Sequence, residues 1–245
     1  MEFRVFLPAT LALRQKFKQY QSTTQATETA SLGIGIVGGT FNPVHLGHLR
    51  AAEEVAESLH LGQVIFIPAA KPPHKSTAGL VSFEHRWRML ELAVSGNPRF
   101  VVSDLEHQRP GKSYSVETLT QLSKQYGRDE ELYFVLGLDA FLELPTWKSY
   151  RELFNLCHFV VVARPGFAPE SLDEMLKTQI DDSYLFDSEV QGYVHPNQYV
   201  VYYREITLLD ISSSNIRNLL ANGCSVRYLL PDKVEDYIRQ EGLYR

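Results

Sequence analysis

The sequence predicts an α/β protein with a doubly wound, mostly parallel β-sheet. Short apolar runs typical of buried strands alternate with amphipathic helical patterns from residue 33 to the end of the 245-residue chain. Glycines and prolines stand where these patterns stop. Such alternation favours parallel strands joined by crossover helices, and ligands of such sheets bind beside the carboxyl ends of the strands.

The first strand–helix–strand unit shows this pattern most clearly. Residues 34–37 and 64–68 are apolar runs, and residues 46–59 between them carry apolar side chains at helical spacing. The first strand and the helix are joined by Gly38-Gly39-Thr40-Phe41-Asn42-Pro43-Val44-His45-Leu46-Gly47-His48. A glycine turn before a helix N-terminus exposes backbone N–H groups, which favour a bound anion such as phosphate.

The later elements are predicted from the same patterns. Further helices are expected at residues 83–95, 116–126, 148–155, 169–178 and 212–220, and from Pro231 to a stop at Gly242. Further strands are expected at residues 100–103, 132–136, 159–163, 199–203 and 206–209. Residues 181–197 have no clear period, and no structure is assigned to them.

Composition limits the class of protein. With 44% hydrophobic and 22% charged residues the chain is typical of globular proteins, and a net charge of -5 provides no basic field for nucleic acid. No apolar run reaches the roughly 20 residues of a transmembrane helix. Cys157 and Cys224 form no metal-binding or disulfide pattern. We therefore expect a cytoplasmic protein with neither nucleic acid nor a membrane as partner, and its oligomeric state is left open.

The first 31 residues differ from the rest. They are poor in acidic residues, and residues 21–31 are rich in Ser, Thr and Gln. This composition is typical of a disordered tail, of a start codon placed too far upstream, or of a transit peptide. We expect an N-terminal extension at residues 1–31 and a single domain at residues 32–245.

Two stretches match phosphate-binding motifs in residue order but lack the structural context that these motifs require. Residues 33–38 match GxGxxG, but the first glycines open the strand instead of following it, and no acidic residue ends the second strand. Residues 111–113 resemble the end of a P-loop, but Glu106 occupies the position of its upstream glycine. We reject both a dinucleotide fingerprint and a P-loop.

Two histidines form the first candidate site. His45 and His48 lie three residues apart and share one face of the first helical turn. A metal site would need further His, Cys or carboxylate ligands, and none has suggestive spacing. We therefore expect both rings to donate hydrogen bonds to phosphate oxygens. The same cradle is expected to include Gly38, Gly39, Thr40 and Phe41.

A serine-rich helix start forms the second candidate site. Ser212, Ser213 and Ser214 stand at the start of the helix expected at residues 212–220. Serines at this place can simply cap the helix. Arg217 follows on the first turn, where a guanidinium can bind phosphate beside exposed amides. We expect both roles together.

These motifs resemble the HxGH nucleotidyltransferase superfamily, which has a Rossmann-like fold. Residues 38–48 resemble its histidine signature, and residues 211–217 resemble its ISSTxIR motif with Ser214 replacing threonine. Between them lie segments that resemble bacterial nicotinate-nucleotide adenylyltransferases, in the order KPPHK (71–75), SYSVETL (113–119), GLD (137–139), LPTW (144–147) and RPG (164–166). The resemblance covers the chain from about residue 33 to the C-terminus.

The resemblance implies transfer of an adenylyl group from ATP to nicotinate mononucleotide, with Mg²⁺, giving deamido-NAD and pyrophosphate in NAD biosynthesis. It assigns catalysis to His45, His48 and Arg217. It assigns ATP binding to Gly38, Gly39, Thr40, Phe41, Gly137, Asp139, Ser212, Ser213, Ser214 and Ile216. It assigns acceptor binding to Lys75, Tyr114, Ser115, Trp147 and Arg164.

Some of these assignments have ordinary alternatives. Trp147 would stack on the nicotinate ring, yet a tryptophan is often simply part of the core. Lys75 and Arg164 could equally be solvated surface charges. Asn42 stands where the family commonly has aspartate, and Ser115 where threonine is usual, which loosens the acceptor assignment.

Three other functions are compatible with parts of the sequence. The same chemistry could act on nicotinamide mononucleotide or 4′-phosphopantetheine. A class I aminoacyl-tRNA synthetase fragment is disfavoured, because the chain lacks a KMSKS-like partner motif and a basic surface. A non-catalytic nucleotide sensor is disfavoured because ground-state binding alone does not need both histidines and Arg217.

Overall fold

The computed structural model describes residues 33–72, 79–126, 130–163, 170–207 and 209–245. These residues belong to one compact unit, Leu32–Arg245. The N-terminal extension expected at residues 1–31 lies outside the described residues.

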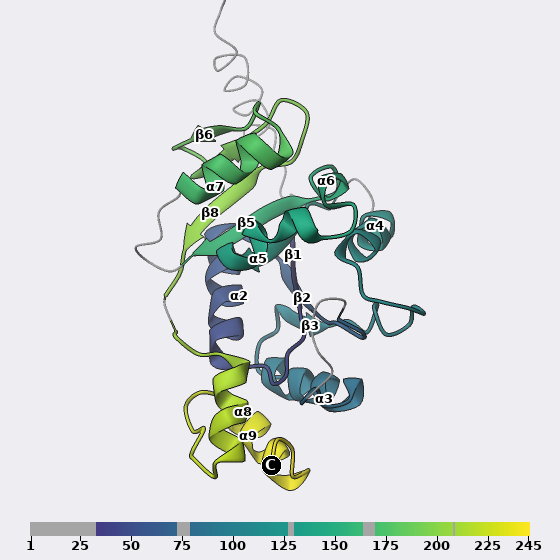
Figure 1. Cartoon of the computed structure of the whole chain (residues 1–245), viewed down its shortest axis with the longest axis vertical. Coiled ribbons are helices and arrows are strands. Elements are labelled where there is room, and N and C mark those ends of the chain that lie inside the picture. The colour runs from purple at the N-terminus through teal and green to yellow at the C-terminus, as the bar shows by residue number, and fades with distance from the viewer. Residues whose placement is uncertain (1–32, 73–78, 127–129, 164–169, 208) are drawn as a thin grey trace, which may run out of the picture. The chain divides into compact units, whose positions relative to one another are not determined.

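A single sheet organises the unit (Figure 1). Its strands, among the described residues, are β1 (Ile34–Gly39), β2 (Gln63–Pro68), β3 (Phe100–Val102), β4 (Leu132–Gly137), β5 (His158–Ala163), β6 (Leu185–Asp187), β7 (Gly192–Val194) and β8 (Val201–Glu205). They lie in the order β3-β2-β1-β4-β5-β8-β7-β6. Pairing is parallel from β3 across to β8 and antiparallel for β7 and β6. The doubly wound, mostly parallel sheet predicted from the sequence is confirmed.

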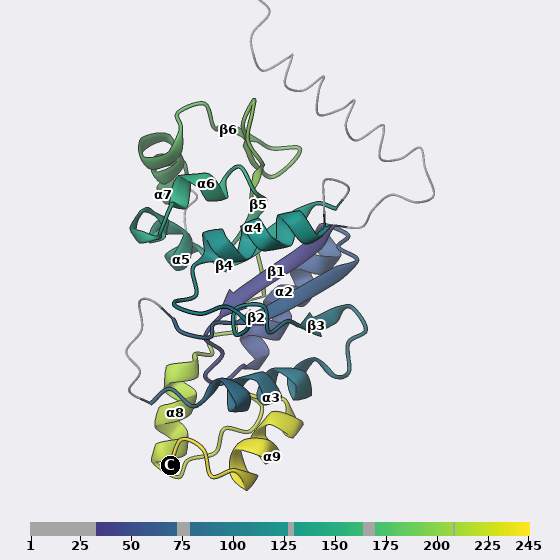
Figure 2. The ribbon, with the colours of Figure 1, turned by 90° about the vertical axis from the view of Figure 1, so that its right-hand side faces the viewer.

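Helices connect the strands and cover both faces of the sheet. They are α2 (Leu46–Ser58), α3 (Phe83–Val94), α4 (Ser115–Tyr126), α5 (Leu138–Leu142), α6 (Tyr150–Leu153), α7 (Glu170–Met175), α8 (Ser213–Ala221) and α9 (Asp232–Gln240). The described residues also contain a short 3₁₀ helix, η1 (Leu144–Thr146), and a short π-helix, η2 (Leu176–Ile180). Helices α2 and α4 cover opposite faces of the strands (Figure 2).

Helix boundaries follow the capping residues that the sequence provides. Ser82 accepts a hydrogen bond from the His85 N–H at 3.4 Å at the start of α3. Ser212 accepts one from the Asn215 N–H at 3.2 Å at the start of α8. Each serine oxygen satisfies an N–H group that has no partner within its helix. The predicted starts of both helices are confirmed.

The core lies against β4 and β5, whose side chains are almost all buried. Phe159 is fully buried and stacks on Phe154 with ring centroids 4.6 Å apart. Phe141 meets Phe159 edge to face at 5.5 Å, and Phe134 meets it at 6.0 Å. Such ring contacts contribute beyond their buried area and hold the strand ends that carry the candidate site. In the part of the chain described, no helix has the length and apolarity that crossing a bilayer requires.

The structure differs from the expectations in three places. The stretch 181–197 contains β6 and β7, which extend the sheet as an antiparallel hairpin. Each has only three residues, too few to show an alternating pattern. The strand expected at residues 206–209 does not form, because the Thr207 N–H donates to Glu54 of α2 at 2.9 Å instead of to a strand. Residue 208 lies outside the described residues.

The third difference lies between β4 and β5. The helix expected at residues 148–155 is reduced to α6, because Ser149 adopts a left-handed conformation with φ 49° and starts a new helical segment. Two further short segments, α5 and η1, precede it and were not expected. Together they place residues 137–148 at the carboxyl ends of the central strands.

Candidate active site

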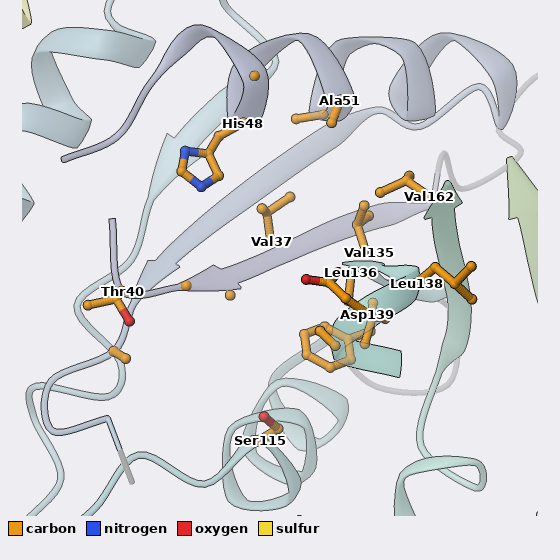
Figure 3. Close-up of a pocket in the computed structure, with 18 of the residues that line it drawn as sticks. Val37, Thr40, His48, Ala51, Ser115, Val135, Leu136, Leu138, Asp139 and Val162 are labelled. Carbon is orange, nitrogen blue, oxygen red and sulfur yellow. The ribbon is translucent and has the colours of Figure 1, made fainter. Parts of the chain in front are cut away.

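A cavity of about 840 Å³ lies at the carboxyl ends of β1, β4 and β5. Its walls come from the turn after β1, the first turns of α2, α4 and α5, and the segment between β8 and α8. The neighbours β1 and β4 are the place where the strand order reverses direction, which is where ligands of doubly wound sheets bind. Figure 3 shows His48 and Asp139 facing this cavity from different elements.

The cavity gathers predicted site residues from several parts of the chain. Those on its wall are Gly38, Gly39, Thr40, His45, His48, Tyr114, Ser115, Gly137, Asp139 and Trp147. They come from four of the motifs, at residues 38–48, 113–119, 137–139 and 144–147, which the parallel sheet brings to the carboxyl ends of its strands.

The remaining selected residues lie elsewhere. Phe41 is buried directly beneath the turn, with 2% of its surface exposed. Ser212, Ser213, Ser214, Ile216 and Arg217 belong to the start of α8 and are not on the cavity wall, although Leu209 and Ile211 just before them are. Lys75 and Arg164 lie outside the described residues.

The two histidines form a stacked pair at the start of α2. Their ring centroids lie 3.6 Å apart. The His45 N–H donates to Nδ1 of His48 at 3.3 Å, so this nitrogen is unprotonated and the neutral His48 ring carries its proton on Nε2. This tautomer of His48 carries an N–H group, the kind of donor that a phosphate oxygen accepts from.

Burial sets the charge of the inner histidine. His45 is 6% exposed, and desolvation lowers its pKa to about 4. The ring is therefore neutral near pH 7 and carries no charge that would cost energy inside the protein. Gly47 leaves room for it, since a Cβ at that position would come within 3.1 Å of His45 Nδ1.

The turn that precedes the histidines has an unusual backbone conformation. Phe41 has a positive φ of 50°, and its ring lies where a Cβ on Gly39 would approach it to 3.0 Å. Glycine at position 39 lets this ring pack against the backbone. The following Asn42–Pro43 peptide bond is cis.

Asn42 connects the turn to distant parts of the chain. Its Nδ2 donates to the Gly79 carbonyl at 2.8 Å, and its Oδ1 accepts from the Val81 N–H at 3.3 Å. The Tyr244 hydroxyl donates to the same Oδ1 at 2.8 Å, and burial raises the pKa of Tyr244, which keeps this donor protonated. A carboxylate at position 42 could not donate to Gly79, so the amide found here is matched to its partners.

Helix α8 is attached to the same turn. Ser213 Oγ donates to the Pro43 carbonyl at 2.8 Å. Arg217 donates to the Asn42 carbonyl at 2.8 Å and to Ser214 Oγ at 3.2 Å. In this structure the arginine expected at the triphosphate thus holds the backbone that leads into the histidine pair.

Aromatic side chains also line the cavity. Trp147 is half-buried and meets Phe134 edge to face at 6.4 Å, so it packs on the core and lines the cavity at once. Tyr114 is a second aromatic residue on the wall. The Lys148 ammonium lies 4.5 Å from the centroid of the Tyr114 ring and pairs with Glu117 at 2.7 Å. The sequence analysis did not select Lys148, although it directly follows the LPTW segment.

The comparisons with known proteins agree on one family. A model of the cytidylyltransferase-like family matches residues 36–219. A probable nicotinate-nucleotide adenylyltransferase of Geotalea daltonii is 49% identical over 211 residues, which are 86% of this chain and 97% of that protein. The chain belongs to the nicotinate-nucleotide adenylyltransferase family. A probable member from Geobacter sulfurreducens is 46% identical, again over 86% of this chain and 97% of the relative.

Solved structures of the family have the same fold. The Plasmodium falciparum nicotinic acid mononucleotide adenylyltransferase complexed with NaAD matches with a TM-score of 0.67 and 19% identity, covering 87% of this chain and 97% of that one. The same protein complexed with APC matches with a TM-score of 0.65 and 17% identity. These likenesses support the Rossmann-like nucleotidyltransferase fold of the sheet described above.

Asp139 is positioned by its neighbour Gly137. It stands in the first turn of α5, with an exposed carboxylate, at the carboxyl end of β4. A Cβ at Gly137 would lie 2.5 Å from Asp139 Oδ1, so only glycine leaves the carboxylate where it is. Among the described residues, no group of three or more His, Cys, Asp or Glu side chains is arranged to hold a metal ion.

Burial of His45 predicts a pH-dependent stability. Its pKa is about 4 in the folded protein against an ordinary 6.5, so the unfolded chain binds more protons between these values. The stabilisation is complete above pH 6.5 and is lost as the pH falls towards 4. At pH 4.5 we expect it to be about 2 kcal/mol smaller than at pH 7. Urea unfolding of wild type and His45→Asn at both pH values measures it: the variant should lack this part of the loss, and His60→Asn should retain it.

Gly137→Ala tests the placement of the Asp139 carboxylate in this family member. The added methyl displaces the carboxylate, and loss of a hydrogen bond to a charged group should raise the KM for ATP about tenfold. Gly96→Ala, where a Cβ meets nothing within 4 Å, is the matched control. Steady-state kinetics at varied ATP distinguishes the two, and an unchanged KM in Gly137→Ala would contradict a role for Asp139 in binding ATP.

Proposed function

We propose that this protein transfers the adenylyl group of ATP to nicotinate mononucleotide, forming deamido-NAD and pyrophosphate in NAD biosynthesis. The observation that carries the proposal is a single cavity with two chemically different groups of lining residues. A histidine pair at a helix N-terminus is one group, and the aromatic side chains of Trp147 and Tyr114 are the other. The first suits phosphates and the second suits a planar heterocycle.

The size of the cavity agrees with two substrates bound together. Its volume of about 840 Å³ lies in the upper part of the 300–1,000 Å³ range typical of small-molecule sites. Two nucleotides that react with each other must lie side by side with their phosphates in contact. The cavity extends from β1 across β4 to β5, which provides such a continuous site.

The proposed reaction is a direct displacement at the α-phosphorus of ATP. The 5′-phosphate oxygen of the acceptor forms the new P–O bond, and the bond to the bridging oxygen of pyrophosphate breaks. A phosphate has its second pKa near 6, so this oxygen is already ionised at pH 7 and needs no general base. The residues therefore act by positioning and by stabilising charge.

The histidine pair supplies the charge stabilisation. The Nε2–H of His48, fixed by the bond that its Nδ1 accepts, would donate to a phosphate oxygen on which negative charge increases. His45 supports this ring by stacking on it and stays neutral. Arg217 would act through the Asn42 carbonyl, holding the turn in place.

We propose that Mg²⁺ enters with ATP as part of the substrate. Mg²⁺ prefers oxygen ligands and keeps several bound waters. Triphosphate oxygens and waters can therefore coordinate the ion with few ligands from the protein. Asp139 is one of three carboxylates on the cavity wall, with Glu106 and Glu143, and a substrate-borne ion needs no cage made of them. The ion would neutralise charge that accumulates on the triphosphate.

The choice of acceptor is tested with purified protein, ATP and Mg²⁺. Nicotinate mononucleotide, nicotinamide mononucleotide and 4′-phosphopantetheine are supplied in separate reactions, and pyrophosphate release is followed. We expect turnover with nicotinate mononucleotide at a kcat/KM well above that with the amide. Equal use of the amide would make the enzyme dual-specific, and no turnover with any acceptor would overturn the proposed reaction.

The role of His48 is tested by His48→Ala. Loss of a preorganised donor to the reacting phosphate should lower kcat by about 10²–10³-fold. This effect should exceed the loss of stability, which we expect to be about 1 kcal/mol because the His45 N–H loses its acceptor. His60→Asn, an exposed histidine beyond the end of α2, is the control and should keep wild-type kcat. Near-normal turnover in His48→Ala would remove His48 from the mechanism.

A further inference from the structure

Arg86 is a fully buried cation that the reaction proposed above does not use. It lies on α3, is 1% exposed, and is the largest of the fully buried side chains. Every hydrogen-bond acceptor that it meets in the described residues is a backbone carbonyl. Burying a charge costs free energy of desolvation, which hydrogen bonds to the charged group must offset. The set of four carbonyl partners therefore points to a role for Arg86 in holding the backbone.

The two shortest contacts of Arg86 reach two neighbouring segments of the cavity wall. Its Nη1 donates to the Thr40 carbonyl at 2.9 Å and to the Ala69 carbonyl at 2.8 Å. Thr40 follows β1 and Ala69 follows β2, and both line the cavity. Longer contacts reach the carbonyls of Ala70 at 3.5 Å and Val81 at 3.3 Å. One guanidinium thus bridges the carboxyl ends of two adjacent strands.

The bond to Thr40 fixes the direction of the next amide. In a trans peptide the C=O and the following N–H point in opposite directions. Because Arg86 binds the Thr40 carbonyl, the Phe41 N–H is turned away from Arg86. Phe41 also has φ 50°, a conformation that a side chain adopts only when its surroundings enforce it. Arg86 is one of the groups that enforce it.

The bonds to Ala69 and Ala70 act in the same way on the second segment. Their carbonyls face Arg86, and the amides that follow face the other way. The Ala70 N–H and the Lys71 N–H both donate to Ser113 Oγ, at 3.0 and 3.2 Å. Ser113 directly precedes Tyr114 and Ser115, which line the cavity. A continuous chain of hydrogen bonds therefore joins the turn at Thr40 to the segment that carries Tyr114 through Arg86.

The charge of Arg86 is available to the cavity. Burial lowers its pKa from the ordinary value, yet a guanidinium remains protonated near pH 7. The carboxylate that acts on it through space is Glu84, which is exposed, and Tyr244 is the other titratable group nearby. An anion held at Thr40 would feel this cation with little screening.

We propose that Arg86 is a positioning residue that holds the phosphate-binding turn at Thr40 and the acceptor-side loop at Ala69 in one fixed arrangement, and that its buried charge favours the triphosphate. The proposal rests on the reaction proposed above. It assigns to one residue outside the recognised motifs both a geometric task, through four carbonyls, and an electrostatic task, through its charge.

Two substitutions separate these tasks. Arg86→Lys keeps the positive charge but has one nitrogen, which cannot bridge the Thr40 and Ala69 carbonyls with the same geometry. Arg86→Met keeps much of the length and loses both functions. Arg88→Met, an exposed arginine on the same helix that pairs with Glu91, is the matched control. Each protein is assayed for turnover, for urea unfolding, and for calorimetric binding of tripolyphosphate and of adenosine as separate probes.

The two tasks predict different results. Arg86→Lys should lower kcat about 10²-fold through misplacement of the substrates, while tripolyphosphate binding stays within about threefold of wild type. Arg86→Met should in addition weaken tripolyphosphate binding about tenfold and leave adenosine binding unchanged. Equal weakening of both probes in Arg86→Met, or a kcat within threefold of wild type in Arg86→Lys, would overturn the proposal.

A third variant, Ser113→Ala, keeps Arg86 and tests the hydrogen-bond chain even if Arg86→Met does not fold. Ser113→Ala removes the oxygen that accepts from Ala70 and Lys71. It should raise the KM for the acceptor severalfold while the KM for ATP is unchanged, and an unchanged acceptor KM would contradict the chain of hydrogen bonds.

Tripolyphosphate binding does not depend on the identity of the acceptor. Absence of wild-type turnover with intact anion binding would therefore reject the proposed reaction and leave the electrostatic part of this inference standing.

Discussion

The parallel pairing of β1 with β4 is the constraint on which the rest of the site depends. Strand order changes direction between these two strands, so the connections that leave them pass over opposite faces of the sheet and cannot close the gap at their carboxyl ends. The turn after β1 carries the histidine pair, and the turn after β4 carries Gly137 and Asp139. Segments that are about a hundred residues apart in the chain thereby face one another across a single space.

Several side chains of this site act by fixing the backbone conformation of the turns around the cavity. Asn42, Arg86 and Arg217 all act on main-chain groups of the turns, binding carbonyls or amides that line or support the cavity. Such bonds leave substrate-facing groups unobstructed and fix where each N–H points. Preorganisation of this kind is what a reaction without a general base or covalent intermediate needs, because orientation and charge are then its main resources.

The sequence predicted the sheet class, most helices and ten residues of the cavity wall, because periodicity, caps and ordered motifs are local signals. It failed where the determinant was tertiary. Residues 206–209 have a strand-like composition, but Glu54 on another element takes the Thr207 amide. Arg86 sits in an ordinary amphipathic helix pattern, and nothing nearby in the sequence reveals its carbonyl partners. Lys148 follows a recognised motif, but its place beside Tyr114 depends on how α4 packs.

The hydrogen bond between Tyr244 and Asn42 joins residues 202 positions apart. During synthesis on the ribosome, at about 5–20 residues per second, the turn would be made roughly 10–40 s before the tyrosine that secures it. In that interval the nascent sheet can form, while the turn lacks one of its partners. The newly made protein would therefore form most of its sheet before the turn after β1 has all of its hydrogen-bond partners, so that completion of this turn is a late event in its biogenesis.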